Sequence, residues 1–345
     1  ANGDFYPDCL LTNPLANGEC GTISNLNLGK PVNTTTYADD VLLDNRNYNW
    51  QGSVSLQQEL RPGTALNVGY FRTSYGNLQA TTNRAFTAAD FDTFCVTAPT
   101  DARLGDNSGK QLCGFYDVKP AKFGQEDILI TQSANFGKQT EVFDGVDIGM
   151  NTRYGQGGII QGGISFGRTV TDKCDVVQKN PQVTFTVDGS AGLGATVGED
   201  FCRVTNTNQT QVKAAANYPL PFFGLEASAT YQNNPGLPVN ATLVVPNSAI
   251  APQIGRNLSA GATANVTVAL MKPYQEVGDR LQQIDVRFGK RLTLGRMKIR
   301  GQFDIYNLFN ANNVLSQNAA YGASWQAPSS VLGARLFKFG VQIDY

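Results

Sequence analysis

The clearest pattern in the chain is an alternation of apolar and polar residues over its last ten positions, 336–345. The apolar members are Phe337, Phe339, Val341, Ile343 and Tyr345. A period of two predicts a β-strand with one apolar and one polar face. A transmembrane β-barrel needs such strands, with apolar side chains toward lipid, polar ones toward the lumen and an aromatic residue at the interface. A strand of a soluble sandwich is the alternative for this segment alone.

The same alternation recurs earlier in the chain. It covers residues 50–60, 66–71, 142–154, 160–167, 212–218, 225–232, 284–294 and 297–305. Tight turns join these segments in pairs, and long polar connections join one pair to the next, as outer-membrane barrels do. We predict an all-β fold, an antiparallel up-and-down meander of an outer-membrane β-barrel, with about nine strands, short turns and long disulfide-bearing loops. Residues 1–48 are predicted to be an N-terminal loop region of the extracellular type, and residues 49–345 a partial barrel.

Six cysteines fall in the predicted loops. They are Cys9, Cys20, Cys95, Cys113, Cys174 and Cys202. An even number outside the cytosol favours disulfides, although six cysteines allow about 15 connectivities. Because neighbouring cysteines share one connection, we expect sequential pairing, with buried free thiols as the alternative.

Composition excludes several classes of protein. The net charge of −1 implies no nucleic-acid partner, and no run of about 18 apolar residues predicts a transmembrane helix. The mean hydropathy of −0.24 is compatible with a barrel, which shows only alternate residues to lipid. Histidine is absent, which removes the Ser-His-Asp triad and the commonest zinc ligand. We therefore expect no enzymatic activity and no cofactor.

Two groups of residues outside the strands could bind a ligand. Asn2, Asp4 and Asp8 cluster oxygen atoms, which fits either a calcium site or an Asx-rich turn. The second group, Phe91, Phe94, Phe115 and Tyr116, lies in a long connection of about residues 79–136, which we expect to be irregular. These aromatic residues could hold a ligand at the outer mouth or pack around a disulfide.

The polar sides of the last strands carry charges of both signs. The predicted lumen-facing residues are Asp285, Arg287, Arg291, Arg300 and Asp304, with Lys338 on the same side. They could contact a substrate or a plug, or pair with one another across strands. The residues predicted to face lipid are Val286, Phe288, Ile299, Phe303, Phe339 and Val341.

Three segments near the C-terminus resemble a known family. The sequences QIDVRFGK (283–290), DIYNLFN (304–310) and RLFKFGVQIDY (335–345) are similar to the C-terminal strands of TonB-dependent receptors of the Oar-like, carboxypeptidase-regulatory type. In that family, the full barrel has 22 strands and an N-terminal plug. The resemblance implies that this chain is the C-terminal part of such a barrel. Neither a plug nor a TonB box is visible in this chain. The resemblance further implies that Phe337, Phe339, Val341, Ile343 and Tyr345 form the signal read during assembly.

These observations predict a bacterial outer-membrane, receptor-like barrel that takes up or binds a ligand at the cell surface. Its expected partners are outer-membrane lipid, a small-molecule, oligosaccharide or peptide ligand, and a TonB-type energy-coupling protein if a plug exists elsewhere. The alternative is a non-transport surface protein, either an adhesin or a structural filament, because open sheet edges invite self-association. A secreted carbohydrate-binding sandwich or solenoid fits the alternating loop lengths poorly.

Overall fold

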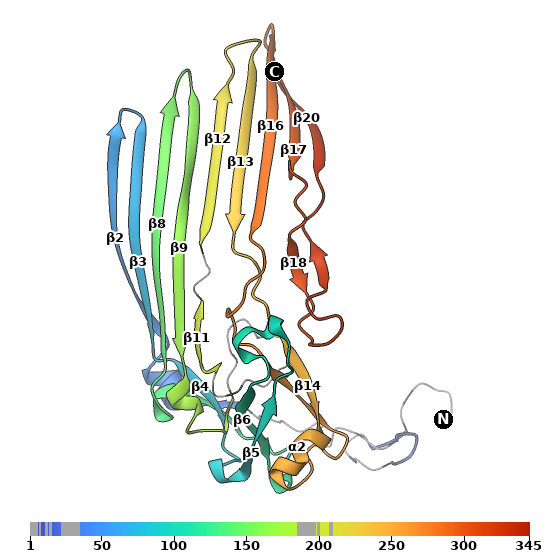
Figure 1. The fold of residues 1–345 in the computed structure, drawn as a ribbon. Coiled ribbons are helices and arrows are strands. Elements are labelled where there is room, and N and C mark those ends of the chain that lie inside the picture. Colours follow the sequence, from blue (N-terminus) through green and yellow to red (C-terminus); the bar gives the residue numbers. More distant parts are fainter. Residues whose placement is uncertain are drawn as a thin grey trace.

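The computed structural model describes residues 6, 8–10, 13, 16–21, 35–184, 198, 201–206 and 210–345. Within this part of the chain, the main feature is a ten-stranded antiparallel sheet. Nine strands follow one another in the order β2-β3-β8-β9-β12-β13-β16-β17-β20, and β11 adds to β9. Figure 1 shows these long strands side by side, with the remaining elements gathered mainly at one end.

The strands of this sheet have the following bounds. They are β2 (Tyr48–Arg61), β3 (Thr64–Gly76), β8 (Thr140–Tyr154), β9 (Gly158–Asp172), β11 (Arg203–Asn206), β12 (Gln211–Pro219), β13 (Leu225–Asn234), β16 (Leu281–Leu294), β17 (Met297–Tyr306) and β20 (Leu336–Asp344). The expected fold class is confirmed: this is an all-β antiparallel meander, with short turns at one end and long connections at the other.

Two glycines make the shortest turns feasible. Gly63 follows Pro62 between β2 and β3 and has a φ of 80°, which a side chain would disfavour. Gly295 opens the two-residue turn between β16 and β17 with a φ of 64°. A positive φ at this position belongs to the turn types that match the twist of the strands.

The nine strands share one apolar face. Its register runs straight across the sheet: Leu56, Val68, Ile148, Ile164 and Val212 occupy one cross-strand row. In the described residues, no buried apolar side chain belongs to these nine strands. The apolar side chains of this face are therefore exposed or half-buried, and Phe339 and Val341 retain 79% and 71% of their accessible surface.

The long connections fold together into a second unit, which we call the cap. It comprises the described parts of residues 35–47, 77–139, 173–202, 235–280 and 307–335. Its strands are β1 (Thr35–Tyr37), β4 (Gln79–Asn83), β5 (Phe91–Thr97), β6 (Gln111–Val118), β7 (Ile128–Gln132), β10 (Val183–Thr184), β14 (Thr242–Pro246), β15 (Asn265–Ala269), β18 (Val314–Gln317) and β19 (Pro328–Val331). Its helices are α1 (Cys174–Val177), α2 (Asn247–Ile254), the π-helical turn η1 (Asp40–Asp44) and the 3₁₀ turns η2 (Ala88–Asp90), η3 (Ala102–Asn107), η4 (Pro120–Lys122) and η5 (Ser133–Asn135).

The expectation that residues 79–136 are irregular is wrong, because the cap has its own hydrophobic core. A single buried cluster contains residues from four different connections. They are Phe115, Phe201, Ile250 and Trp325, one from each connection. Burial of apolar surface between connections stabilises structure that no single connection could hold alone.

The cysteines are bonded in sequential pairs. Cys95–Cys113 links β5 to β6, and Cys174–Cys202 links α1 to the start of β11. Cys9–Cys20 closes a short segment near the N-terminus. Cross-links that close 11 to 28 residues reduce the entropy of the unfolded chain.

Candidate functional site

The polar face of the sheet is the candidate functional site. All five charged residues expected there, Asp285, Arg287, Arg291, Arg300 and Asp304, lie on this face of β16 and β17, as the strand register shows. Lys338 of β20 lies opposite Asp304 on the same face.

Ion pairs neutralise much of the charge on β13, β16 and β17. Nε of Arg287 lies 2.5 Å from Oδ1 of Asp304, and Nη2 of Arg287 lies 3.0 Å from its Oδ2. Glu226 of β13 binds Arg291 at 2.8 Å and also binds Arg300. Of the two interpretations of these charges, cross-strand pairing is the one present in the structure.

Glu226 is the residue of this candidate site that the sequence did not reveal. It is buried although both of its arginine partners are partly exposed. The space for its side chain comes from Gly289 on the neighbouring strand, where an added Cβ would lie 2.6 Å from Cγ of Glu226. An acidic residue opposite a glycine is the only sequence signal for this arrangement, and it requires the register to be known.

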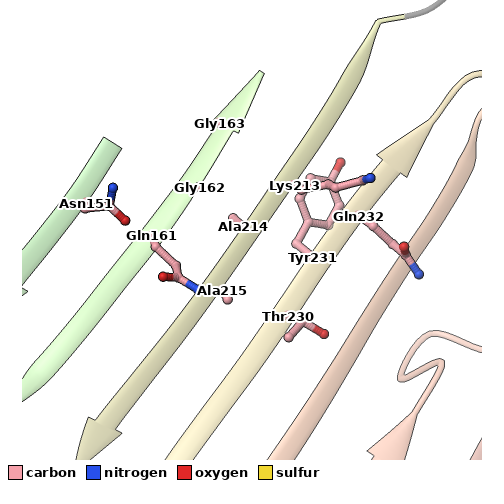
Figure 2. Close-up of a pocket in the computed structure, with 10 residues that line it drawn as sticks. All are labelled: Asn151, Gln161, Gly162, Gly163, Lys213, Ala214, Ala215, Thr230, Tyr231 and Gln232. Atoms are coloured by element: carbon pink, nitrogen blue, oxygen red, sulfur yellow. The ribbon is translucent and has the colours of Figure 1, made fainter. Parts of the chain in front are cut away.

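A shallow trough of about 480 Å³ crosses the other half of the polar face. Its floor is formed by Gly163 and Ala215, and the side chains around it are Asn151, Gln161, Thr230, Gln232 and Lys213. Figure 2 shows these residues on neighbouring strands, with Lys213 and Gln232 together near one end. A neighbouring hollow of about 680 Å³ shares Asn151 and Gln161 and continues toward β2.

The trough differs chemically from the ion-paired half of the face. Carboxamide and hydroxyl groups both donate and accept hydrogen bonds, so they suit neutral polar ligands. Lys213 has no ion-pair partner among the residues that the structure describes, and it would attract an anionic group. No cluster of three or more Cys, Asp or Glu residues in the described part of the chain could hold a metal ion.

The other sequence-based candidates are not at this site. Phe94 and Phe115 are buried and stack with ring centroids 5.6 Å apart. The ligand-binding interpretation of these two aromatic residues is therefore wrong, since packing in the cap accounts for them. Of the calcium candidates, Asn2 and Asp4 lie outside the described residues.

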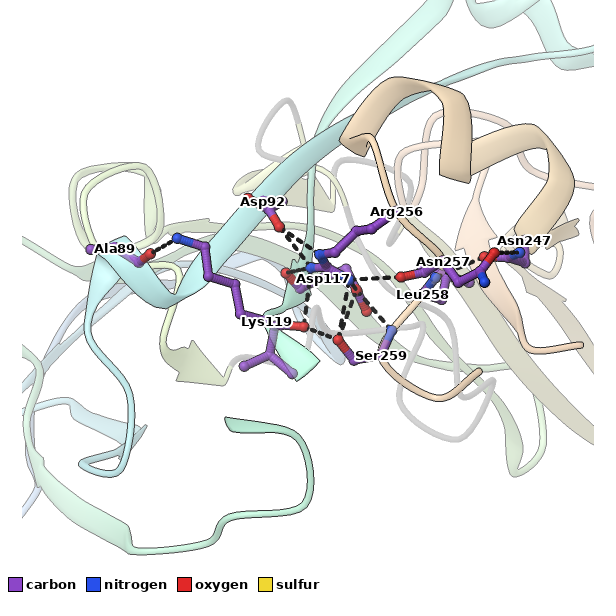
Figure 3. Close-up of polar contacts among 10 residues, drawn as sticks. Ala89, Asp92, Asp117, Lys119, Asn247, Arg256, Asn257, Leu258 and Ser259 are labelled. Carbon is purple, nitrogen blue, oxygen red and sulfur yellow. Dashed lines mark hydrogen bonds and ion pairs between the residues drawn. The ribbon is translucent and has the colours of Figure 1, made fainter. Parts of the chain in front are cut away.

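The cap is held together by a network around Arg256, which follows α2. Its guanidinium binds Asp92 at 2.7 Å and Asp117 at 2.5 Å, and Asp117 also accepts a hydrogen bond from the backbone N–H of Ser259. Figure 3 shows how these bonds connect the β5–β6 hairpin to the segment after α2. Because all these groups are paired with each other, the network is structural rather than a ligand site.

A second cluster joins η3 to the connection between β18 and β19. Arg103 hydrogen-bonds to Asp101 and lies 4.7 Å above the ring of Trp325, and the hydroxyl of Tyr321 donates to Asp101. The hydrogen bonds from Arg103, first from its side chain and then from its backbone, lower the pKa of Asp101 to about 2.

This cluster predicts acid sensitivity of the cap. The folded pKa of Asp101 lies below the ordinary value of 3.8, so its stabilising effect is complete above that value and is lost as the pH falls toward about 2. In a Trp50→Phe background, we expect the fluorescence of Trp325 to change over this pH range. Asp101→Asn should remove this step from the titration, and an identical titration curve in both proteins would contradict the assignment.

Comparison with known proteins gives few matches. No protein-family model and no curated protein matches the chain. Among solved structures, it is similar to the outer membrane transporter YddB from Escherichia coli, with a TM-score of 0.44, 10% identity, and coverage of 89% of this chain and 34% of that one. It is also similar to the copper transporter OprC, with a TM-score of 0.35, 6% identity, and coverage of 86% and 31%. The chain spans about a third of the length of both. At these TM-scores, the likeness adds nothing to the strand order already described.

Among the described residues, no helix is both long and apolar enough to cross a membrane.

Proposed function

We propose that the chain forms part of a receptor-like β-barrel in the bacterial outer membrane, which binds or takes up a ligand at the cell surface. The single observation that carries this proposal is the exposed apolar face, continuous across nine antiparallel strands whose opposite face is polar. Exposed apolar patches larger than a few hundred Å² are rare on soluble monomers. Lipid would cover this face and would leave the polar face to line the lumen.

The trough supports the binding part of the proposal. Its carboxamides and Lys213 fit a small-molecule, oligosaccharide or peptide ligand with polar groups. The proposal includes no catalytic activity. The proposal includes a TonB-type partner only if the complete protein has a plug. The support for such a partner is the family resemblance of residues 283–345.

The test of the membrane placement is site-directed spin labelling at positions 284 to 288 of the protein reconstituted in lipid vesicles. We expect accessibility to alternate, with lipid contact at positions 284, 286 and 288 and water contact at 285 and 287. Uniform water accessibility would contradict the placement.

The trough is tested by screening oligosaccharide and peptide libraries with the wild type and with Lys213→Met. A ligand whose binding is unchanged by that substitution would argue against the trough as its binding site.

A second candidate function, a surface protein that assembles with itself, is favoured by the edges of the sheet. All residues of β2 are exposed, and in the described chain no strand pairs with the outer edge of either β2 or β20. Free edges are templates for further strands. The mass of the detergent-solubilised particle distinguishes the candidates, because a filament grows with concentration whereas a receptor-like barrel has a fixed mass.

A further inference from the structure

Three charged residues form one cross-strand row at the cap end of the apolar face. Arg72 of β3 is opposite Asp144 of β8, which is opposite Arg168 of β9. Since side chains alternate between faces, these three share the face of Val146. Nη1 of Arg72 lies 2.7 Å from Oδ1 of Asp144, and Nη2 of Arg168 lies 3.8 Å from Oδ2. The hydroxyl of Tyr70 also donates to Oδ1 of Asp144, at 2.7 Å.

This row lies about one hydrocarbon thickness from an aromatic pair at the turn end. Tyr154 and Tyr218 stack there with ring centroids 5.2 Å apart, and tyrosine is enriched at membrane interfaces. Tyr154 and Asp144 are ten residues apart on β8, which is ~33 Å along a strand at about 3.3 Å per residue. At a tilt of about 45°, this is a depth of ~23 Å, close to the ~25 Å apolar band of outer-membrane barrels. The charged row therefore lies where headgroups replace hydrocarbon.

The two guanidinium groups outnumber the carboxylate between them and are more exposed. The side chains of Arg72 and Arg168 are 53% and 57% exposed, against 23% for Asp144. Each guanidinium has five N–H donors. In the described part of the chain, the side-chain partners of Arg72 are Asp144 and Tyr70, and Arg168 has only its longer ion-pair contact. Gly52 of β2 is directly opposite Arg72, so the partner position in this row has no side chain.

We propose that Arg72 and Arg168, held in place by Asp144, bind the phosphate of an anionic lipid headgroup in the leaflet on the cap side. The planar fork of arginine fits two phosphate oxygens, and a second arginine exceeds what one carboxylate can neutralise. Val146 and Phe166 lie directly beneath the row on the apolar face, where they would contact acyl chains; this favours a lipid over free phosphate. The inference rests on the proposed membrane placement but is independent of any ligand in the trough. Its consequence is that the arginine row fixes the depth of the sheet in the membrane.

The test is native mass spectrometry of the full-length protein in detergent, titrated with phosphatidylglycerol, phosphatidylcholine and inorganic phosphate. We expect preferential retention of phosphatidylglycerol. Arg168→Gln should weaken this binding by about fivefold, and the double variant with Arg72→Gln by more. Arg168→Lys keeps the charge but loses the fork, so it should fall between wild type and Arg168→Gln. Asp144→Asn keeps a carbonyl acceptor that can hold Arg72 in place but removes the competing negative charge, so it should bind phosphatidylglycerol at least as tightly as the wild type.

Arg84→Gln is the matched control, because it removes the same charge from a cap arginine that pairs with Asp127. An equal loss of lipid in this control, or a loss in Asp144→Asn as large as in Arg168→Gln, would overturn the proposal. If equimolar inorganic phosphate displaced the lipid, the claim that the bound phosphate belongs to a lipid headgroup would be wrong. Vesicle insertion of the wild type separates the two proposals: a protein that inserts without preferring the anionic lipid refutes only the arginine site, whereas one that does not insert refutes the membrane placement.

Discussion

Replacing Ile148 by arginine should prevent the sheet from assembling in a membrane. Ile148 points from the apolar face of β8, near the midpoint between Tyr154 and Asp144, and would lie deep in the hydrocarbon. Arginine on the lipid face of a barrel costs about 2–4 kcal/mol at the midplane. We expect the variant to lose heat-modifiable migration on gels and to fold into phosphatidylcholine vesicles only at lower urea concentrations than the wild type.

The adjacent position supplies the control. Asp147 lies on the polar face of the same strand, so Asp147→Arg places the same side chain in water and should leave folding into vesicles nearly unchanged. If both variants lost folding equally, the two faces of the strand would not differ in their contact with lipid and water. The apolar face would then be covered by protein, as a self-assembling filament requires.

The sheet could be predicted from the sequence because its signal is long and local. Alternation continues for about 13 residues in segment 142–154, and the strand observed is Thr140–Tyr154. Glycine and proline mark the ends of such strands, as at Pro62 and Gly63. A short-range pattern repeated in each hairpin therefore determines strand, face and turn together.

The cap could not be predicted because its structure depends on contacts between distant segments. The strands β5 and β6 have seven and eight residues, too short for their alternation to be distinctive. The backbone of Cys95 exchanges two hydrogen bonds with the side chain of Gln253, and the indole of Trp325 donates to the carbonyl of Asn240. No local propensity encodes pairings of this kind.

The same limit applies to the candidate site. The face that carries Arg291 and Arg300 follows from alternation alone, but their partner Glu226 lies on another hairpin. Glu226 reaches both arginines only because β13, β16 and β17 are adjacent in one register and Gly289 leaves room. Side-chain direction could thus be predicted from the sequence, whereas charge pairing required the tertiary arrangement.

Truncating Phe115 to alanine should unfold the cap while the sheet stays assembled. Phe115 is fully buried, stacks on Phe94 and lies two residues from the Cys95–Cys113 disulfide. Removing a buried phenylalanine costs about 3–5 kcal/mol, because the apolar burial is lost and a cavity remains. In a Trp50→Phe background, urea titration of Trp325 fluorescence should show a lower midpoint for the cap. Heat-modifiable migration should be unchanged, because the apolar side chains of the nine strands contribute nothing to the buried core.

Phe123 provides the comparison within the cap, since it is 53% exposed and its truncation should change the free energy of unfolding of the cap by less than about 0.5 kcal/mol. If Phe115→Ala abolished membrane assembly as well, the cap and the sheet would be one cooperative unit rather than two. If it left the fluorescence of Trp325 unchanged, the four connections would not share one core. The distinction bears on stability, because a cap that unfolds alone would be a separate cooperative unit at one end of the sheet.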